Sequence, residues 1–254
     1  MIDNKNLNIN IIISPAKKMV ISEDSSLKTS TPQFIDSSKI LYSLLQSFDF
    51  NNLKKLLCCN DDIAELNFER YKSFDFYNNL TPAVFAYEGI QYKYISPNTM
   101  TIDELNYLND HLNILSGFYG ILKASDGVNP YRLEMQARLS SSEFKNLYDF
   151  WGNRLYQNLK KENSIILNLA SKEYSKCIEK YLTSDDTFIT CIFGSLKDGK
   201  VRVKATEAKM ARGSMVRYLA KNNVHTISKI KEFSDLGFSF SKEYSDTTTF
   251  VFLK

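Results

Sequence analysis

The segment 165–182, IILNLASKEYSKCIEKYL, places a continuous apolar run directly before an amphipathic pattern. The apolar run at 165–169 is typical of a strand buried on both faces, as strands of parallel sheets covered by helices are. Ser171 can cap the helix that the spacing predicts over 172–182. A strand that leads directly into a helix predicts a sheet with helices packed on it.

Strands and helices alternate on both sides of this segment. Towards the N-terminus, an apolar strand at 10–13 ends at Ser14-Pro15, where the proline removes a hydrogen-bond donor. Further strands are expected at 82–87, 92–95, 188–193 and 200–203, the last two joined by a type I′ turn at Asp198-Gly199. The 254 residues therefore predict an α/β or α+β mixed fold, a single compact domain over 1–254 with a central mixed sheet.

Helices are expected at 40–48, 101–112 and 206–221, and residues 22–31 have the polar, aperiodic sequence of a surface loop. Thr101 and Glu104 form a capping box at the start of the second helix. The first helix is expected to bury a stripe made of Ile40, Leu41, Leu44, Leu45 and Phe48.

Residues 51–76 are a candidate inserted helix-hairpin-helix, with short helices at 53–57 and 63–71. The connection Cys59-Asn60-Asp61-Asp62 contains capping residues but lacks the glycines of a DNA-binding hairpin. A helical pair that packs its leucines into the core explains the same pattern, and both interpretations stay open.

Composition excludes several classes of site. The four cysteines (Cys58, Cys59, Cys177 and Cys191) have no CxxC spacing and the chain has two histidines, so we expect no metal site, no stoichiometric iron and no cofactor. There is no Walker loop, no GxGxxG and no GxSxG around Ser171. The start lacks the apolar region of a signal peptide and no later run could span a membrane, so we expect a cytoplasmic protein with reduced thiols.

Positive charge is local, because 32 basic residues against 29 acidic ones give a net charge of +3. Affinity for nucleic acid would therefore need a cluster of cations, since Lys and Arg bind phosphate oxygens. On the late helix, three cations span about 140° of the circumference at 100° per residue, although a solvated face has the same pattern. The candidate phosphate-binding residues are Lys17, Lys18, Arg132, Arg138, Lys209, Arg212 and Arg217.

Two acidic residues near these cations are candidates for proton transfer. Glu134 lies two residues after Arg132, and Asp126 precedes them. An enzyme that acts on a nucleotide could use Glu134 or Asp126 as general acid/base, with Arg132, Arg138 and Lys17 holding phosphate. A structural ion pair between Arg132 and Glu134 explains their spacing equally well.

Several strings in the chain resemble motifs of the YaaA peroxide-stress family, also designated UPF0246. The most specific are LSGFYGIL at 115–122 and PYRLEM at 130–135, and SPAKKM at 14–19 is another. The segments 147–152, 168–174 and 210–218 extend the resemblance over most of the chain. The chain departs from the family pattern at 123–125 and 136–137. The motif residues expected to have structural roles are Ser14, Pro15, Asn168, Ser171 and Tyr174.

The resemblance implies a cytosolic protein of the hydrogen peroxide response that helps limit iron-dependent oxidative DNA damage. It also implies a mixed α/β fold and DNA binding by a helix-hairpin-helix. We expect the partner to be double-stranded or distorted DNA, bound largely independently of sequence and without a membrane, and we take a monomer as the default. Binding is the expected activity. The alternative is an enzyme that acts on a nucleotide, nucleobase or damaged nucleic acid.

Overall fold

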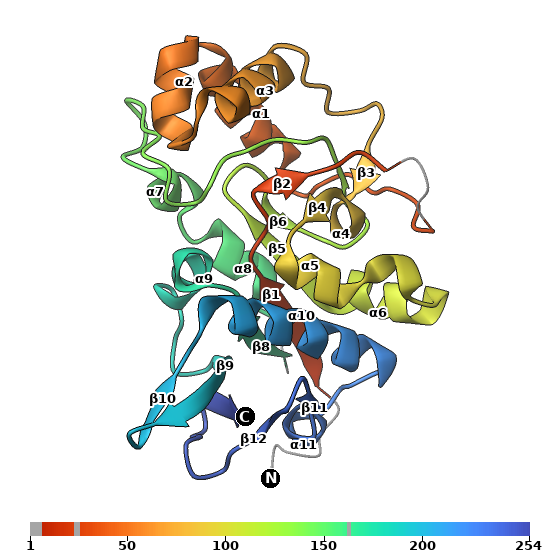
Figure 1. Ribbon diagram of the computed structural model, residues 1–254. Helices are drawn as coiled ribbons and strands as arrows, with labels where there is room; N and C mark the ends of the chain where they lie inside the picture. The colour runs from red at the N-terminus through yellow and green to blue at the C-terminus, as the bar shows by residue number, and fades with distance from the viewer. Residues whose placement is uncertain (1–6, 23–25, 162–163) are drawn as a thin grey trace.

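Two apolar strands form the centre of the structure, β1 (Asn8–Ile13) and β8 (Ser164–Leu169). They pair in parallel with Ile13 opposite Leu169, and both of these side chains are fully buried. The computed structural model describes residues 7–22, 26–161 and 164–254 (Figure 1). Both strands agree with the sequence prediction, because an apolar run without alternation fits a strand covered on both faces.

The strands form a mixed nine-stranded sheet of order β11-β12-β13-β9-β8-β1-β5-β6, with β10 beside β9. The five central strands are parallel and the edges are antiparallel. The chain passes from β1 to β5 on one side and then to β8 on the other, so the carboxyl ends of β1 and β8 form a topological switch point. The remaining strands are β5 (Leu112–Ser116), β6 (Gly120–Leu122), β9 (Thr187–Lys197), β10 (Lys200–Arg202), β11 (Ser234–Asp235), β12 (Phe238–Phe240) and β13 (Thr249–Leu253).

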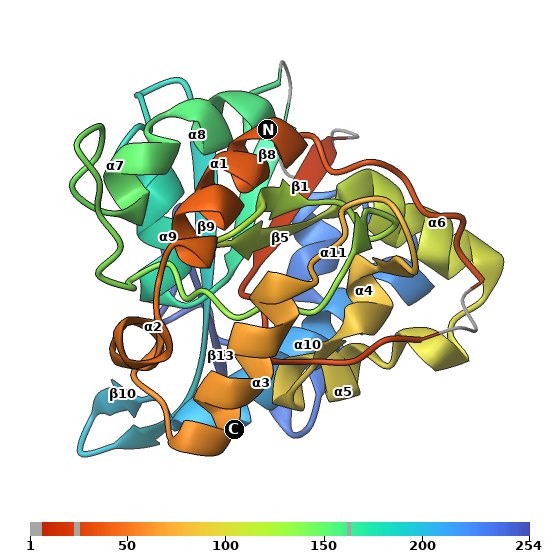
Figure 2. The same ribbon diagram turned by 90° about the horizontal axis from the view of Figure 1, so that it is seen from above.

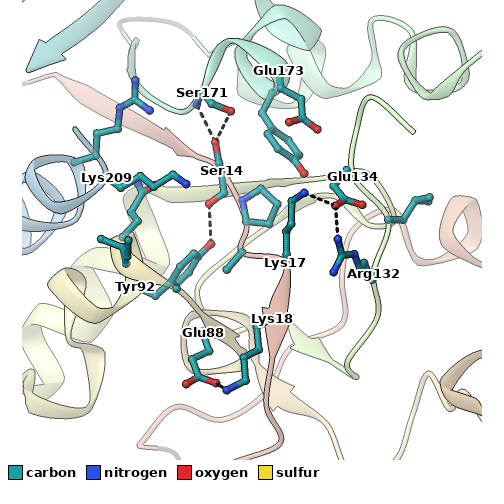
Figure 3. Close-up of a pocket in the computed structure, with 18 of the residues that line it drawn as sticks. Ser14, Lys17, Lys18, Glu88, Tyr92, Arg132, Glu134, Ser171, Glu173 and Lys209 are labelled. Atoms are coloured by element: carbon teal, nitrogen blue, oxygen red, sulfur yellow. Dashed lines mark hydrogen bonds and ion pairs between the residues drawn. The ribbon is translucent and has the colours of Figure 1, made fainter. Parts of the chain in front are cut away.

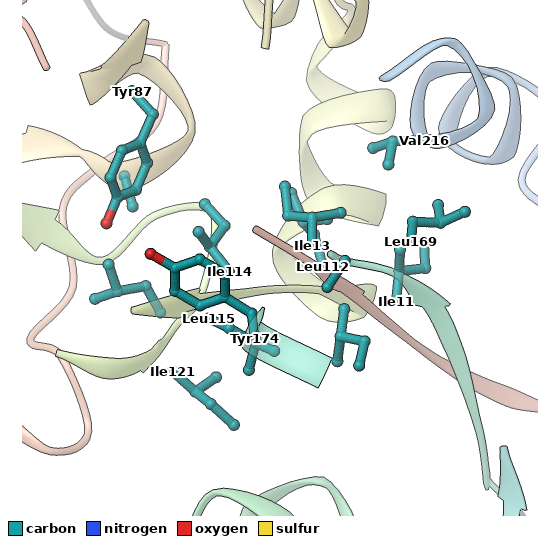
Figure 4. Close-up of a cluster of buried hydrophobic side chains, with 14 of the residues drawn as sticks. Ile11, Ile13, Tyr87, Leu112, Ile114, Leu115, Ile121, Leu169, Tyr174 and Val216 are labelled. Atoms are coloured by element: carbon teal, nitrogen blue, oxygen red, sulfur yellow. The ribbon is translucent and has the colours of Figure 1, made fainter. Parts of the chain in front are cut away.

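Helices cover both faces of the sheet (Figure 2). One face carries α1 (Ile35–Gln46), α7 (Leu147–Trp151), α8 (Arg154–Leu159) and α9 (Lys172–Glu179). The other face carries α5 (Ile90–Ile95), α6 (Ile102–His111), α10 (Ala205–Lys221) and α11 (Ile227–Lys231). Between the sheet and these helices, buried side chains such as Ile11, Ile114 and Val216 form the core (Figure 4).

Two helices, α2 (Phe50–Leu57) and α3 (Asp61–Lys72), lie beyond the carboxyl ends of the central strands (Figure 1). The side chains of Asp49 and Asn60 cap them by accepting hydrogen bonds from backbone N–H groups. The helical pair was expected from the sequence. Leu53, Leu56 and Leu57 of α2 are buried in the core, whereas Leu66 of α3 is 51% exposed. Its role in DNA binding stays a prediction.

The chain between β1 and α6 contains short elements that position loops. These elements are β2 (Lys18–Met19), β3 (Thr81–Pro82), α4 (Ala83–Ala86), β4 (Tyr87–Glu88) and η1 (Pro97–Thr99). β2 pairs with β4, and β3 pairs with β7 (Gly127–Val128). No helix in the described part of the chain is long and apolar enough to cross a membrane.

Four local predictions were wrong. Residues 92–95 form part of α5 because Gln91, Tyr92 and Ile95 follow a helical stripe. The run at 82–87 contains the helical turn α4, since an apolar run alone does not separate a strand from a buried helix. Ile40 is 55% exposed. The helix at 172–182 ends at Glu179.

In the expected loop at 22–31, residues 23–25 lie outside the described ranges, and Ser30 pairs with Asp126.

The capping box at Thr101 and Glu104 and the hairpin at Asp198-Gly199 are present as expected. Asp198 and Gly199 both have positive φ, as a type I′ turn requires. The helix that begins with the capping box ends at His111, because Leu112 pairs as the first residue of β5.

Candidate functional site

Two serines join the ends of β1 and β8 at the switch point. The backbone N–H of Ser171 donates to Oγ of Ser14 at 2.8 Å, and Oγ of Ser14 lies 3.1 Å from Oγ of Ser171. Oη of Tyr92 donates to the carbonyl of Ser14 at 3.0 Å. Ser171 occupies the N-cap position of α9, but its side chain accepts no hydrogen bond from the helix. The serines therefore hold the β1 loop against the start of α9.

A pocket of about 410 Å³ opens beside this junction (Figure 3). Its walls come from five segments that are far apart in the sequence. Ligands of open α/β sheets bind at such a position, outside the carboxyl ends of strands at a switch point. The pocket is lined by residues 14–18, 88–92 and 131–134, by Ser171, Glu173 and Tyr174 near the start of α9, and by Lys209 and Arg212 on α10.

On one wall, two cations share the carboxylate of Glu134. Oε1 of Glu134 lies 2.9 Å from Nζ of Lys17 and 3.1 Å from a terminal nitrogen of Arg132. The Glu134 and Arg132 side chains are 13% and 11% exposed, whereas Lys17 is 67% exposed. The ion pair between Arg132 and Glu134 is therefore present, and Lys17 extends it towards solvent.

The segment that carries Arg132 and Glu134 is held in place by contacts with α3 and with Gly117. Oη of Tyr71, on α3, donates to the carbonyl of Arg132 at 2.8 Å, so the helical pair supports the pocket. Gly117 packs against the same segment, and a Cβ there would lie 2.5 Å from the carbonyl oxygen of Leu133. Two of the family-like strings, at 115–122 and 130–135, therefore pack backbone against backbone at Gly117, where a larger residue would not fit.

A second, larger pocket of about 910 Å³ adjoins the first. Lys17 and Glu134 line both pockets, and Arg138 lines the second together with Asn52, Lys55 and Leu56 from α2. We call the two pockets together the basic cleft. The sequence predicted seven cations, and six of them line the basic cleft: Lys17, Lys18, Arg132, Arg138, Lys209 and Arg212.

The opposite wall of the first pocket is formed by α5 and α10. Figure 3 shows Lys209 on one side of Ser14 and the Glu134 ion pair on the other. Within the described residues, Nε2 of Gln91, Nε of Arg132 and Nε of Arg212 are the buried side-chain atoms that lack a hydrogen-bond partner. All three residues line this one pocket. Burial lowers the pKa of Arg212, because the charged guanidinium loses hydration.

Glu173 lies at the start of α9 on the pocket wall. Its Oε1 accepts a hydrogen bond from the backbone N–H of Gln136 at 3.3 Å. Burial raises the pKa of Glu173, and the nearby charge of Glu134 acts in the same direction. Nothing in the sequence distinguishes Glu173 from an ordinary surface residue, because acidic side chains are favoured in the first turn of a helix.

Several predicted residues lie outside the first pocket. The Arg217 guanidinium donates to the carbonyls of Ile95 and Ser96, so it joins α10 to α5. Asp126 is 4% exposed and accepts hydrogen bonds from Oγ of Ser30 and the backbone N–H of Lys123. Burial raises the pKa of Asp126 to about 6. Neither Arg217 nor Asp126 lines the pockets that contain Glu134.

The motif residues expected to be structural lie around the first pocket. Ser14, Pro15, Ser171 and Tyr174 line it. Asn168, at the end of β8, accepts a hydrogen bond from the backbone N–H of Ala170 at 2.9 Å and so forms the turn before α9. In the described ranges, His, Cys, Asp and Glu side chains form no group of three or more that could hold a metal ion.

Sequence reasoning missed Gln91, Tyr92, Glu88 and Glu173. Tyr92 was assigned to a strand at 92–95, and Glu88 and Gln91 fell between the two expected strands. In the structure, α5 brings Gln91 and Tyr92 to the pocket wall. The helical spacing of Gln91, Tyr92 and Ile95 was a signal that could have indicated the helix.

Comparison with known proteins gives consistent matches over nearly the whole chain. A family model described as "Peroxide stress protein YaaA" matches residues 9–244. A UPF0246 protein of Desulfitobacterium hafniense is 51% identical over 244 residues, which cover 96% of this chain and 97% of the relative. A UPF0246 protein of Lachnoclostridium phytofermentans is 51% identical, covering 96% of both chains, and one of Pediococcus pentosaceus is 46% identical, covering 96% and 97%. The chain therefore belongs to the peroxide stress protein YaaA family.

Proposed function

We propose that the protein acts in the cytosolic response to hydrogen peroxide by binding DNA through the basic cleft, and so helps limit iron-dependent oxidative DNA damage. The observation that carries this proposal is the convergence of six predicted cations from four separate segments on two adjoining pockets. Cations gathered from separate segments suit a phosphate backbone, which presents charge along a line. The partner is double-stranded or distorted DNA.

The cations of the cleft differ in how strongly they are bound to carboxylates of the protein in the absence of DNA. Lys18 is 71% exposed and pairs with Glu88, itself half exposed, at 2.7 Å. Such surface pairs contribute about 0 to 1 kcal/mol, so a phosphate can replace the carboxylate at little cost. Lys55 on α2 lines the second pocket as well, which extends positive charge onto the helical pair. Binding should therefore be dominated by phosphates and largely indifferent to base sequence.

A second candidate function is an enzyme that acts on a nucleotide, nucleobase or damaged nucleic acid. The observation that favours it is the position of Glu134, which lines both pockets and is fixed by Lys17 and Arg132. A carboxylate held between cations at the centre of a cleft is suited to general acid/base chemistry. Asp126 is not part of this candidate, because its carboxyl is buried against Ser30 and Lys123.

One comparison of variants separates the two functions. Lys17→Ala combined with Arg138→Ala removes two exposed cations of the cleft, and Lys221→Ala combined with Lys242→Ala removes two exposed cations that line neither pocket. If DNA binding is the function, the first pair weakens binding to all duplexes and lowers the salt slope by about 1.8, at about 0.9 per phosphate. The second pair leaves both unchanged.

Glu134→Gln provides the other half of the comparison. For a binding protein, removal of this carboxylate leaves DNA affinity and peroxide protection intact or higher, because a negative charge leaves the cleft. For an enzyme, the same variant abolishes protection while DNA affinity survives. If the Lys17→Ala, Arg138→Ala double variant bound DNA as tightly as the Lys221→Ala, Lys242→Ala double variant, the result would contradict DNA binding by the basic cleft.

A further inference from the structure

The Arg212 guanidinium lacks the compensation that the other buried arginine of the pocket has. Arg132 pairs with Glu134 at 3.1 Å. For Arg212, the described residues supply no hydrogen-bond partner to the buried Nε, and burial lowers the pKa of the guanidinium. A largely buried guanidinium without a counter-charge is destabilising, so an anion from outside the chain would complete this site.

Gln91 lies on the same wall with its own unsatisfied donor. The residue is 7% exposed, and its Nε2 has no hydrogen-bond partner in the described structure. Gly213, which follows Arg212, brings α10 so close to α5 that a Cβ there would lie 2.2 Å from the carbonyl oxygen of Gln91. Glycine at 213 therefore lets α10 pack directly against the backbone of Gln91, and an unpaired buried donor such as Nε2 of Gln91 is itself costly.

Lys209 adds an exposed positive charge one helical turn before Arg212 on the same wall. Arg212 also lines a separate hollow near Asn168 and Thr190, but Gln91 and Lys209 do not, so their three donor groups converge on the pocket at the switch point. Two cations carry more positive charge than the single negative charge of one carboxylate can balance. They match the three oxygens and nearly two negative charges of a phosphate monoester.

The far wall has the opposite chemistry. Lys17 and Arg132 are already paired with Glu134, and Glu173 lies near that carboxylate. Carboxylates there accept hydrogen bonds from hydroxyl or amino groups and repel a second anion. A pocket of about 410 Å³ lies within the size range of small-molecule sites.

We propose that this pocket binds one phosphate monoester of mononucleotide size, with its phosphate on Arg212, Gln91 and Lys209 and its hydroxyl or amino groups towards Glu134. Arg212 and Lys209 also belong to the basic cleft, but the proposal needs only a single terminal phosphate and no duplex. It holds whether or not the protein binds DNA.

The test uses the full chain without duplex DNA and measures heats of binding for deoxynucleoside 5′-monophosphates. We expect saturable binding of the monophosphates, and none of the matching deoxynucleosides. Inorganic phosphate binding as tightly as the nucleotides would overturn the assignment to mononucleotide size. A single strand with a 5′-phosphate that binds, where its unphosphorylated form does not, supports a strand end as the source of the phosphate. Binding of free nucleotides alone supports a small molecule.

Two variants test whether the wall formed by α5 and α10 binds the phosphate. Arg212→Met and Gln91→Glu should each weaken monophosphate binding about 10- to 100-fold, as expected for loss of a hydrogen bond to a charged group. Both should raise the melting temperature of the unliganded protein, because one removes the uncompensated charge and the other supplies its counter-charge. Lys221→Met, on the same helix outside the pocket, should change neither. Unchanged binding in Arg212→Met, or a lower melting temperature in Gln91→Glu, would refute the site.

Discussion

Ser14 determines the geometry of the site at the scale of a single residue. Its Oγ bonds the backbone of Ser171 and its carbonyl bonds Tyr92, so one residue connects β1, α9 and α5. The sequence identified Ser14 and Ser171 through the family-like motifs, but expected Ser171 as a helix cap. Its hydroxyl lies against Ser14 instead, and such a long-range partner is not encoded in local spacing.

Asp126 gives a prediction about pH at the same scale. Its folded pKa of about 6 exceeds the ordinary value near 3.9, because burial disfavours the charged form. The unfolded chain therefore releases this proton first, and the contribution of Asp126 to stability is fully present below pH 4 and is lost as pH rises to about 6. The loss amounts to about 2 to 3 kcal/mol, at about 1.4 kcal/mol per pKa unit.

Urea denaturation of the wild type and Asp126→Asn at pH 4.5 and pH 7 measures this effect. Between these values the wild type should lose more stability than the variant, which has no carboxyl to ionise. An identical pH dependence in the two proteins would show that the carboxyl is not the source.

At the scale of elements, the contact between α5 and α10 forms the wall that carries Gln91 and Arg212. The sequence predicted α10 closely, from its long amphipathic pattern, but misassigned residues 92–95 as a strand. In this six-residue segment the isoleucines and tyrosines favour a strand, and they outweighed the helical spacing of Gln91, Tyr92 and Ile95. Arg217 donates to the carbonyls at the end of α5, a contact that the sequence did not indicate because α5 was not expected, and phosphate binding by Arg217 stays a prediction.

Gly213→Ala tests this helix contact. Alanine normally stabilises a helix relative to glycine by about 1 kcal/mol. Here we expect destabilisation by about 1 to 3 kcal/mol, since the new Cβ would overlap the carbonyl oxygen of Gln91 and force the helices apart. Denaturation in urea gives the sign directly, and Gly213→Val should lose more. A Gly213→Ala protein as stable as the wild type would contradict the close approach.

At the scale of the whole molecule, the central strands and the long helices were predictable because their patterns are local. The sequence also identified six of the cations that line the basic cleft. It did not predict which of them would be paired. Glu134 compensates Lys17 and Arg132, whereas no ion pair compensates Arg212 in the described structure, and such pairing depends on contacts between segments far apart in the sequence.

The central claim is that DNA is bound by the cations of the basic cleft through its phosphates. A titration of duplexes of different sequence over a salt series tests it most directly. If about four to six phosphates are neutralised, the slope of log affinity against log salt should be about −4 to −5, at about 0.9 per phosphate, with similar affinity for every sequence. A flat salt dependence, or a strong preference for one sequence, would contradict the account.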